Sequence, residues 1–158
     1  MIRWLLDGPL KGFPDIPPVW LSVFLAAAWV LNEYLPLVTA FGLVFRAAGG
    51  LLIGAAFGVI AWSALWFWRK KTTIEPHHEP TALIVEGPYR FSRNPIYLGL
   101  LAILTGYVLW LGSLSPVLLP YLFYEVLTRR FIEPEEEGLR RIFGTEANLY
   151  LNRTHRWF

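Results

Sequence analysis

Long apolar segments separated by short charged ones make up most of the chain. Residues 47–68 are 22 positions without a charge, and a helix needs about 20 such positions to cross the hydrocarbon core of a bilayer. Residues 19–37 are also long enough, although Asn32 and Glu33 lie near their end. The pattern therefore predicts two membrane-spanning helices in the N-terminal half.

A third apolar segment, 96–124, carries no charge but is too long for a single helix. Helix-breaking residues interrupt it in the middle: Gly112, Ser113, Ser115 and Pro116. We therefore predict a tight helical hairpin with arms at 95–111 and 115–129, the second kinked at Pro120. The expected fold is an all-α polytopic membrane protein, a single domain with about four transmembrane helices followed by short C-terminal cytoplasmic helices.

The basic residues give these spans a direction. Of the 14 Lys and Arg residues, Arg46 alone falls on the opposite side of the membrane from the rest. Short cytoplasmic loops are rich in Lys and Arg, so the termini, the loop 69–94 and the tail 130–158 are predicted to be cytoplasmic. Charged residues and prolines precede the first long apolar run, so we expect no cleaved signal peptide.

The tail 130–158 is polar enough to leave the membrane. Apolar residues recur in it at helical spacing: Leu139, Ile142 and Phe143. This spacing predicts a short amphipathic helix with Pro134 in its first turn and Gly144 at its end. A second short helix around 146–152 would follow.

Composition narrows the possible functions. The chain is 55% hydrophobic and 16% charged, a balance too apolar for an ordinary soluble domain. It has no cysteine, which excludes disulfides, thiolate nucleophiles and Cys-ligated zinc. The net charge of +2 comes without a basic tract mixed with aromatics, so we expect no nucleic-acid partner. The histidines and carboxylates lack the spacing of a ligand pair, so we predict no metal site.

Gly50, Gly54 and Gly58 recur every fourth residue in the second span. Small residues at this spacing let another helix approach closely. One possible function follows directly: a non-catalytic module in which this face forms a homo-oligomer and the basic loop binds anionic lipid headgroups.

The loop before the hairpin holds the first group of residues suited to chemistry. It ends in the segment 87–99, Gly-Pro-Tyr-Arg-Phe-Ser-Arg-Asn-Pro-Ile-Tyr-Leu-Gly. Asn94 and Pro95 suit the start of a helix and need no further role. Alternatively, Arg90 or Arg93 binds an anionic group, such as a cofactor carboxylate, at a helix N-terminus that already favours anions.

The tail holds the second group, a run of acids around Pro134: Glu133, Glu135, Glu136 and Glu137. Acids in the first turn of a helix complement its dipole. The functional alternative is that an adjacent pair of carboxylates holds ribose hydroxyls or an ammonium group.

The sequence does not decide the role of two further groups of residues. His77, His78 and Glu79 are the nearest candidates for a general base, although a solvated His pair in a loop needs no function. Glu125 lies inside the fourth span, where an ionisable side chain suggests function, and pairing with Arg129 one turn later is the plainer reading.

Loop and tail carry motif residues in a fixed order. The loop has Gly87-Pro88-Tyr89-Arg90 and then Ser92 through Gly99, and the tail has Glu135-Glu136, Phe143-Gly144, Tyr150, Arg153, Arg156 and Trp157. Together they resemble the superfamily of isoprenylcysteine carboxyl methyltransferases and phospholipid N-methyltransferases. Asn94 stands where the isoprenylcysteine enzymes usually have His, and Asn-Pro-x-Tyr is similar to the phospholipid enzymes and to many small bacterial relatives. Ala147 and His155 replace a usual Tyr and Pro.

The resemblance implies an enzyme that moves a methyl group from S-adenosyl-L-methionine to a lipid or hydrophobic small molecule, leaving S-adenosyl-L-homocysteine. The site would face the cytoplasm, at the inner membrane of a bacterium or archaeon. Carried over, the cofactor-binding residues are Tyr89, Arg90, Arg93, Asn94, Pro95, Tyr97, Gly99, Glu135 and Glu136, and the catalytic ones are Arg93, Asn94 and Tyr97. Whether the acceptor atom is oxygen, nitrogen or sulfur stays open.

Overall fold

The two N-terminal apolar segments form helices α2 (Pro17–Tyr34) and α3 (Leu43–Lys70). The computed structural model describes residues 15–39, 42–70 and 83–158. Helix α2 ends three residues before the predicted limit of 37, because Leu35 precedes Pro36 and leaves the helical conformation. Helix α3 is longer than predicted at both ends, and Arg69 and Lys70 in its last turn complement the helix dipole.

The predicted hairpin consists of α4 (Pro95–Leu111), a 3₁₀ turn (Ser115–Leu118) and α5 (Leu119–Leu127). Gly112 ends α4 in the left-handed conformation, with φ 85°, which glycine adopts without strain. Pro120 lies in the first turn of α5. It therefore lies at the change from 3₁₀ to α-helix, within the arm in which a kink at Pro120 was predicted.

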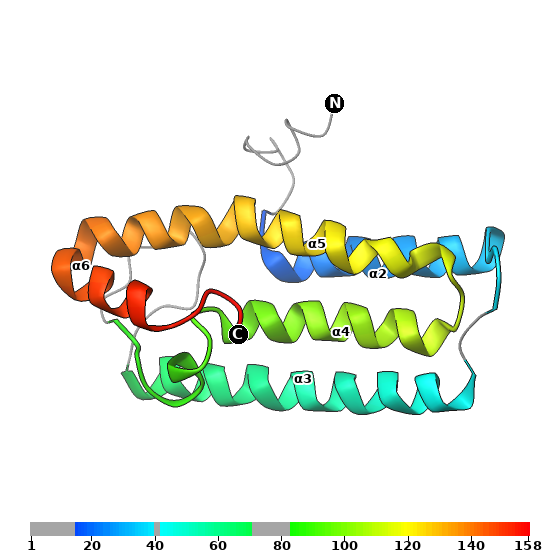
Figure 1. The fold of residues 1–158 in the computed structure, drawn as a ribbon, viewed down its shortest axis with the longest axis horizontal. Helices are drawn as coiled ribbons and strands as arrows, with labels where there is room; N and C mark the ends of the chain where they lie inside the picture. Colours follow the sequence, from blue (N-terminus) through cyan, green and yellow to red (C-terminus); the bar gives the residue numbers. More distant parts are fainter. Residues whose placement is uncertain (1–14, 40–41, 71–82) are drawn as a thin grey trace.

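The tail forms a helix with Pro134 in its first turn, as predicted, but this helix is continuous with α5. A π-helical turn, Thr128–Ile132, joins α5 directly to α6 (Glu133–Arg153). The chain breaks instead at Gly144, whose φ of 52° and ψ of −117° are not helical, which confirms the break predicted there. Figure 1 shows α6 doubling back at its far end, so that the C-terminus lies beside the start of α4.

Helix α4 lies between α3 on one side and α2 with α5 on the other (Figure 1). The contact with α3 depends on small residues: a Cβ on Gly106 would lie 2.7 Å from the carbonyl oxygen of Gly49. The buried residues of α3 are Gly49, Ala56 and Ser63, one every seventh position. On the predicted face, a Cβ on Gly50 would lie 3.2 Å from the Trp110 side chain of α4, whereas Gly54 and Gly58 are exposed with open space around them.

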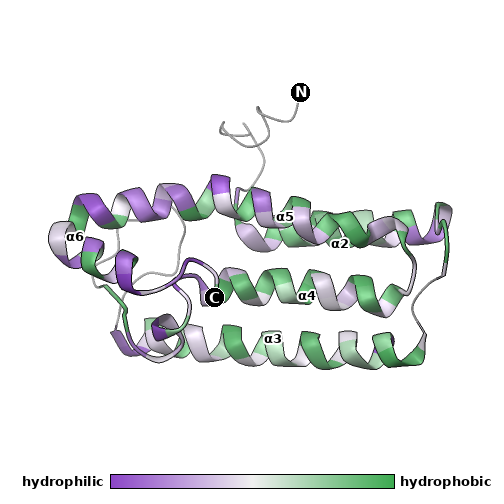
Figure 2. Cartoon of the chain, in the orientation of Figure 1, coloured by the Kyte–Doolittle hydropathy of each residue, from purple (hydrophilic) through white to green (hydrophobic). Residues whose placement is uncertain are grey.

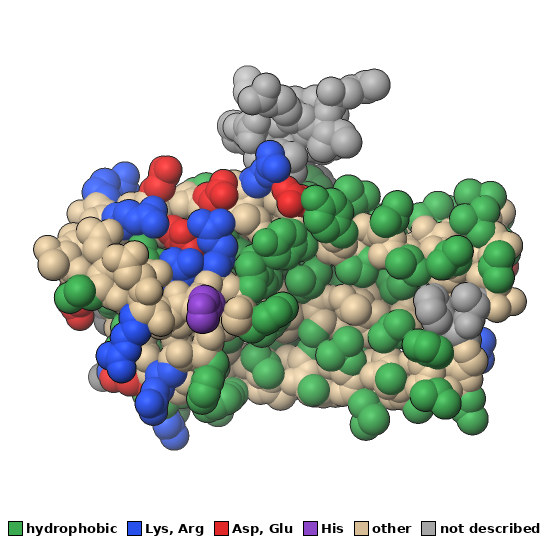
Figure 3. Space-filling view, viewed as in Figure 1, with side chains coloured by type: hydrophobic (Ala, Val, Ile, Leu, Met, Phe, Trp, Pro, Cys, Tyr) green, Lys and Arg blue, Asp and Glu red, His purple; other side chains and the backbone are tan. Residues whose placement is uncertain are grey.

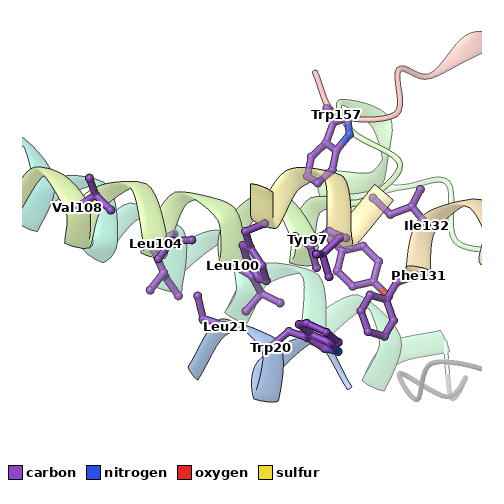
Figure 4. Close-up of a cluster of buried hydrophobic side chains, with 14 of the residues drawn as sticks. Trp20, Leu21, Tyr97, Leu100, Leu104, Val108, Phe131, Ile132 and Trp157 are labelled. Carbon is purple, nitrogen blue, oxygen red and sulfur yellow. The ribbon is translucent and has the colours of Figure 1, made fainter. Parts of the chain in front are cut away.

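The core runs along α4 between α2 and the α5–α6 junction (Figure 4). Its fully buried side chains include Leu104, Phe123, Leu127, Phe131 and Ile132. Outside this core the helices expose many large apolar side chains, among them Leu43, Leu51 and Trp68. In Figure 3 these cover the bundle, while the charged groups gather at the end formed by α6 and the C-terminus.

The predicted all-helical class is confirmed: the described residues form helices joined by loops, with one isolated β-bridge between Thr39 and Ser113. Within this part of the chain, α3 is the one helix both long and apolar enough to cross a membrane by itself, and 11% of its most apolar stretch is buried. Helix α4 is apolar but shorter.

Candidate functional site

Loop and tail meet at the charged end of the bundle (Figures 2 and 3). The backbone N–H of Arg93 donates to the carbonyl of His155 at 3.0 Å. The amide Nδ2 of Asn94 donates to the carbonyl of Arg156 at 2.9 Å, and the hydroxyl of Tyr150 donates to the carbonyl of Tyr89 at 2.9 Å. The last residues of the chain are therefore fastened to the segment that starts α4.

Glu136 is the centre of a buried ionic network. Its carboxylate accepts from Nε and Nη2 of Arg156 at 3.0 and 2.8 Å and lies 3.3 Å from Nη1 of Arg93. Arg140, one turn along α6, lies 3.8 Å away. The side chain of Glu136 is only 5% exposed, and a buried charge needs such compensation. Both of its oxygens are thus occupied.

The pKa values of the two arginines around Glu136 shift in opposite directions. The hydrogen bond with Glu136 raises the pKa of Arg156 above its ordinary value. Burial lowers the pKa of Arg93, and the charge of Glu136 opposes that change. Arg93 also keeps a buried Nε without a hydrogen-bond partner among the described residues. A buried donor without a partner is rare in folded proteins, and a bound group is one explanation for it.

Glu135, the neighbouring acid, has different surroundings. It accepts a hydrogen bond from the hydroxyl of Tyr97 at the start of α4, and no basic side chain of the described residues pairs with it. Burial raises the pKa of Glu135 to about 7, the bond from Tyr97 opposes the rise, and the charge of Glu136 adds to it. Adjacent positions on a helix point about 100° apart, which accounts for the difference between the two acids.

Tyr89 connects the loop to α3. It lies in the 3₁₀ turn Gly87–Arg90, with its ring edge-on to Phe67 at 5.7 Å between centroids. Burial raises the pKa of its hydroxyl, while a hydrogen bond with Ser63 lowers it. Gly87 is needed in this turn because its φ is 60° and a Cβ would meet the indole of Trp66.

The remaining predicted site residues, Arg90, Pro95 and Gly99, have other surroundings. Pro95 is fully buried at the start of α4, and Arg90 is exposed. Gly99 faces α3 instead, where a Cβ would come within 2.5 Å of the Ile60 side chain. Its contact is with another helix of the bundle.

Sequence reasoning missed a second buried charge. Nε of Arg130 lies 2.6 Å from Oδ1 of Asp15, which also accepts from the indole of Trp20 at 3.0 Å. The guanidinium of Arg130 lies 5.6 Å from the centre of the Trp20 ring. The π turn places Arg130 inside the protein, with a side chain 4% exposed. Asp15, an acid just before the first predicted span, was the one sign of this ion pair in the sequence.

One of the two questions left open by the sequence, the role of Glu125, is answered. Arg129 donates to Glu125 at 2.8 Å, so the plainer reading, an ion pair one turn apart, is confirmed. His77, His78 and Glu79 lie outside the described residues. Arg156, which belonged to the resemblance but not to the predicted site, is a main partner of Glu136.

A hollow of about 440 Å³ lies away from the charged end. It is lined from three helices by Leu25, Ala26, Trp29, Ile53, Ile103 and Tyr107. Because these side chains are almost wholly apolar, apart from the hydroxyl of Tyr107, the hollow suits hydrocarbon.

The fold and the site define an all-helical protein with a strongly apolar bundle and a charged cluster at one end. A comparison with known families matches residues 44–146 to the phospholipid methyltransferase family, and the chain belongs to that family. The match runs from α3 to the second half of α6 and confirms the resemblance. Membership implies a membrane-associated methyltransferase of lipid-like substrates. No curated protein and no solved structure matches the chain.

Proposed function

We propose that the protein transfers a methyl group from S-adenosyl-L-methionine to a lipid or other hydrophobic acceptor at the charged end of the bundle. One observation supports this most strongly. The loop, the start of α4 and the tail meet there, so that Arg93, Glu136 and the Tyr97–Glu135 pair lie together where the apolar bundle ends. A polar donor and an apolar acceptor could meet at such a boundary.

The residues present fit the cofactor. Arg93 has a buried Nε to donate, and a guanidinium suits a carboxylate. Glu136 holds Arg93 and Arg156 in place, and Asn94 fixes the tail over the loop. The faces of Tyr89 and Tyr97 can attract a sulfonium charge. When bound, S-adenosyl-L-methionine would supply the activated methyl group, while these residues orient it and exclude water.

We further propose that α2, α3, α4 and α5 all cross the membrane with the charged end in the cytoplasm. The exposed apolar surface and the one-sided basic residues support this orientation. Because the chain has no cysteine, single cysteines can test it. Arg46→Cys should react with an impermeant maleimide from outside, and Arg153→Cys only after lysis; the reverse pattern would invert the topology.

The hollow between α2, α3 and α4 is a place for an acyl chain of the acceptor. Ile103 and Tyr107 follow Tyr97 on α4 by six and ten positions, or about 9 and 15 Å along the axis. An acyl chain there would have its headgroup toward the charged end. The apolar lining supports this occupant.

Isothermal titration of the detergent-purified protein with S-adenosyl-L-homocysteine tests the proposed function. We expect saturable binding at one site per chain. A folded sample that gives no binding heat, and no shift in melting temperature with the ligand, would contradict the cofactor assignment.

A further inference from the structure

We infer that Asp15 is a positioning residue for the proposed methyl transfer: by binding Arg130 inside the protein, it holds the π turn that sets the rotation of α6. This inference rests on the proposed function, because the rotation of α6 places Glu135 and Glu136 at the charged end of the bundle. Neither Asp15 nor Arg130 belongs to the site proposed there.

The contacts of Arg130 show how the pair is built. Nε of Arg130 lies 2.6 Å from Oδ1 of Asp15, and the guanidinium lies over the ring of Trp20, whose indole donates to the same oxygen. The Arg130 side chain is 4% exposed, and a guanidinium is buried at tolerable cost only together with a counter-charge. Asp15, just before α2, therefore makes the inward position of Arg130 possible.

The π turn is a local departure that needs such support. Turns of this kind are rare and occur mostly singly inside α-helices. The turn Thr128–Ile132 joins α5 to α6 in this way, with Arg130 in its middle. It holds about one residue more than an α-helical turn, so the helix beyond it is turned back by about 100°, the rotation of one residue.

This rotation decides which residue of α6 faces the bundle. Leu127 is fully buried in the core, and in an uninterrupted α-helix Pro134, seven positions later, would lie on the same face. In the structure Glu135 reaches α4 instead and accepts the hydrogen bond of Tyr97. The π turn therefore brings an acid, rather than a proline, to the start of α4.

Loss of the π turn would move the first residues of α6 on by one place. Pro134 would then face Tyr97, and Glu136 would lie where the exposed Glu137 now lies, away from its arginines. The turn is also in direct contact with the site, because the ring of the fully buried Phe131 lies 6.3 Å from that of Tyr97 (Figure 4). Release of Arg130 from Asp15 would therefore disturb the site without touching any of its residues.

Three variants separate this role from simple stabilisation. Asp15→Asn/Arg130→Leu removes both charges and keeps the length of the chain. Asp15→Asn with deletion of Arg130 removes both charges and also the extra residue of the turn, so that an ordinary α-helix would place α6 as in wild type. Glu125→Gln, which breaks the more exposed ion pair with Arg129 in the same helix, is the control.

Each protein is titrated with S-adenosyl-L-homocysteine in detergent, after thermal unfolding has shown that it is folded. The full-length double variant should bind at least about tenfold more weakly than wild type, and the deletion variant and Glu125→Gln within about threefold of it. A merely structural ion pair predicts the opposite order for the two double variants, because a deletion in a buried turn disturbs packing more than a substitution.

Spin-label distances give a second measurement, which needs no ligand. The chain has no cysteine, so Glu137→Cys on α6 and Leu65→Cys on α3, both exposed positions, can carry the labels. Rotation of α6 by about 100° should change the label separation by on the order of 5 Å in the full-length double variant. The deletion variant should return it to the wild-type value.

Wild-type affinity or an unchanged label separation in the full-length double variant would overturn the inference, and so would equal losses in both double variants. If neither double variant folds, the pair serves folding rather than positioning, and the inference fails as well. Wild-type protein that binds no ligand would contradict the proposed function, whereas the label distances would still decide the role of Asp15.

Discussion

The apolar bundle and the charged end are held together by different forces. In the bundle, α3 and α4 meet through glycine and small side chains, and close packing decides the contact. At the charged end, directional bonds from Arg93, Asn94 and Arg156 fasten the tail to the loop. Substitutions in the bundle should therefore change stability and acceptor binding, and those at the charged end should change cofactor binding.

The largest effect is expected at Glu136. Glu136→Gln would leave the buried guanidinium of Arg93 and part of Arg156 without a counter-charge. Breaking a buried ion pair in this way costs about 3–5 kcal/mol. Thermal unfolding in detergent should show this loss, and affinity for S-adenosyl-L-homocysteine should fall at least about tenfold. Unchanged affinity in a folded variant would return Glu136 to a purely structural role.

A smaller loss is expected where α3 touches α4. Gly49→Ala would push a Cβ against the backbone of Gly106 and to within 3.0 Å of the Trp110 nitrogen, and backbone cannot move aside. Overpacking of this kind costs about 1–3 kcal/mol. Gly54→Ala is the control, because nothing lies within 4 Å of its Cβ position, and it should be neutral or stabilising. Equal melting temperatures for both variants would refute the packing described here.

The positions of these contacts show how far the sequence could be interpreted. Apolar runs and helix-breaking residues were enough to predict α2 to α5 and the break at Gly144. They could not predict which face of α3 contacts α4, because α3 is apolar on all sides and the hydrophobic pattern selects no face. Gly49 and Gly50 differ by about 100° around the helix. Gly49 meets the α4 backbone, whereas Gly50 meets only the Trp110 side chain.

The sequence predicted that part of the candidate site comes together, but it did not predict the contacts of each residue. The motif brought Arg93, Tyr97 and both acids together, as the structure does. The difference between Glu135 and Glu136 arises because the tail folds back at Gly144 and brings Arg156 to only one of them. The ion pair of Asp15 and Arg130 depends on the π turn. No local sequence pattern predicted that turn.

Burial of the ionised Glu135 should lower the free energy of unfolding at neutral and alkaline pH. Its folded-state pKa of about 7 exceeds the ordinary 4.5. As pH rises from 4.5 to 7 the unfolded chain therefore loses the proton first, and the free energy of unfolding decreases. At pH 8 Glu135→Gln should be more stable than wild type by about 1–3 kcal/mol, and near pH 4 the two should melt alike. A wild type that melts higher than the variant at pH 8 would contradict this burial cost.

The smallest effect is expected in the hollow between α2, α3 and α4. Ala26→Phe would fill part of it. The KM for a long-chain acceptor should rise about tenfold, a loss of about 1.4 kcal/mol, with ligand binding at the charged end unchanged. Val23→Phe, at an exposed α2 position outside the lining, is the control. An equal KM for both variants would place the acyl chain elsewhere.

Labelled methyl transfer tests the central claim most directly. Purified protein is incubated with methyl-labelled S-adenosyl-L-methionine and a total membrane lipid extract, and the lipids are separated and analysed by mass spectrometry. We predict label in a lipid headgroup, in proportion to the amount of wild-type protein and reduced in Glu136→Gln. Folded wild-type protein that leaves every lipid unlabelled would contradict the account.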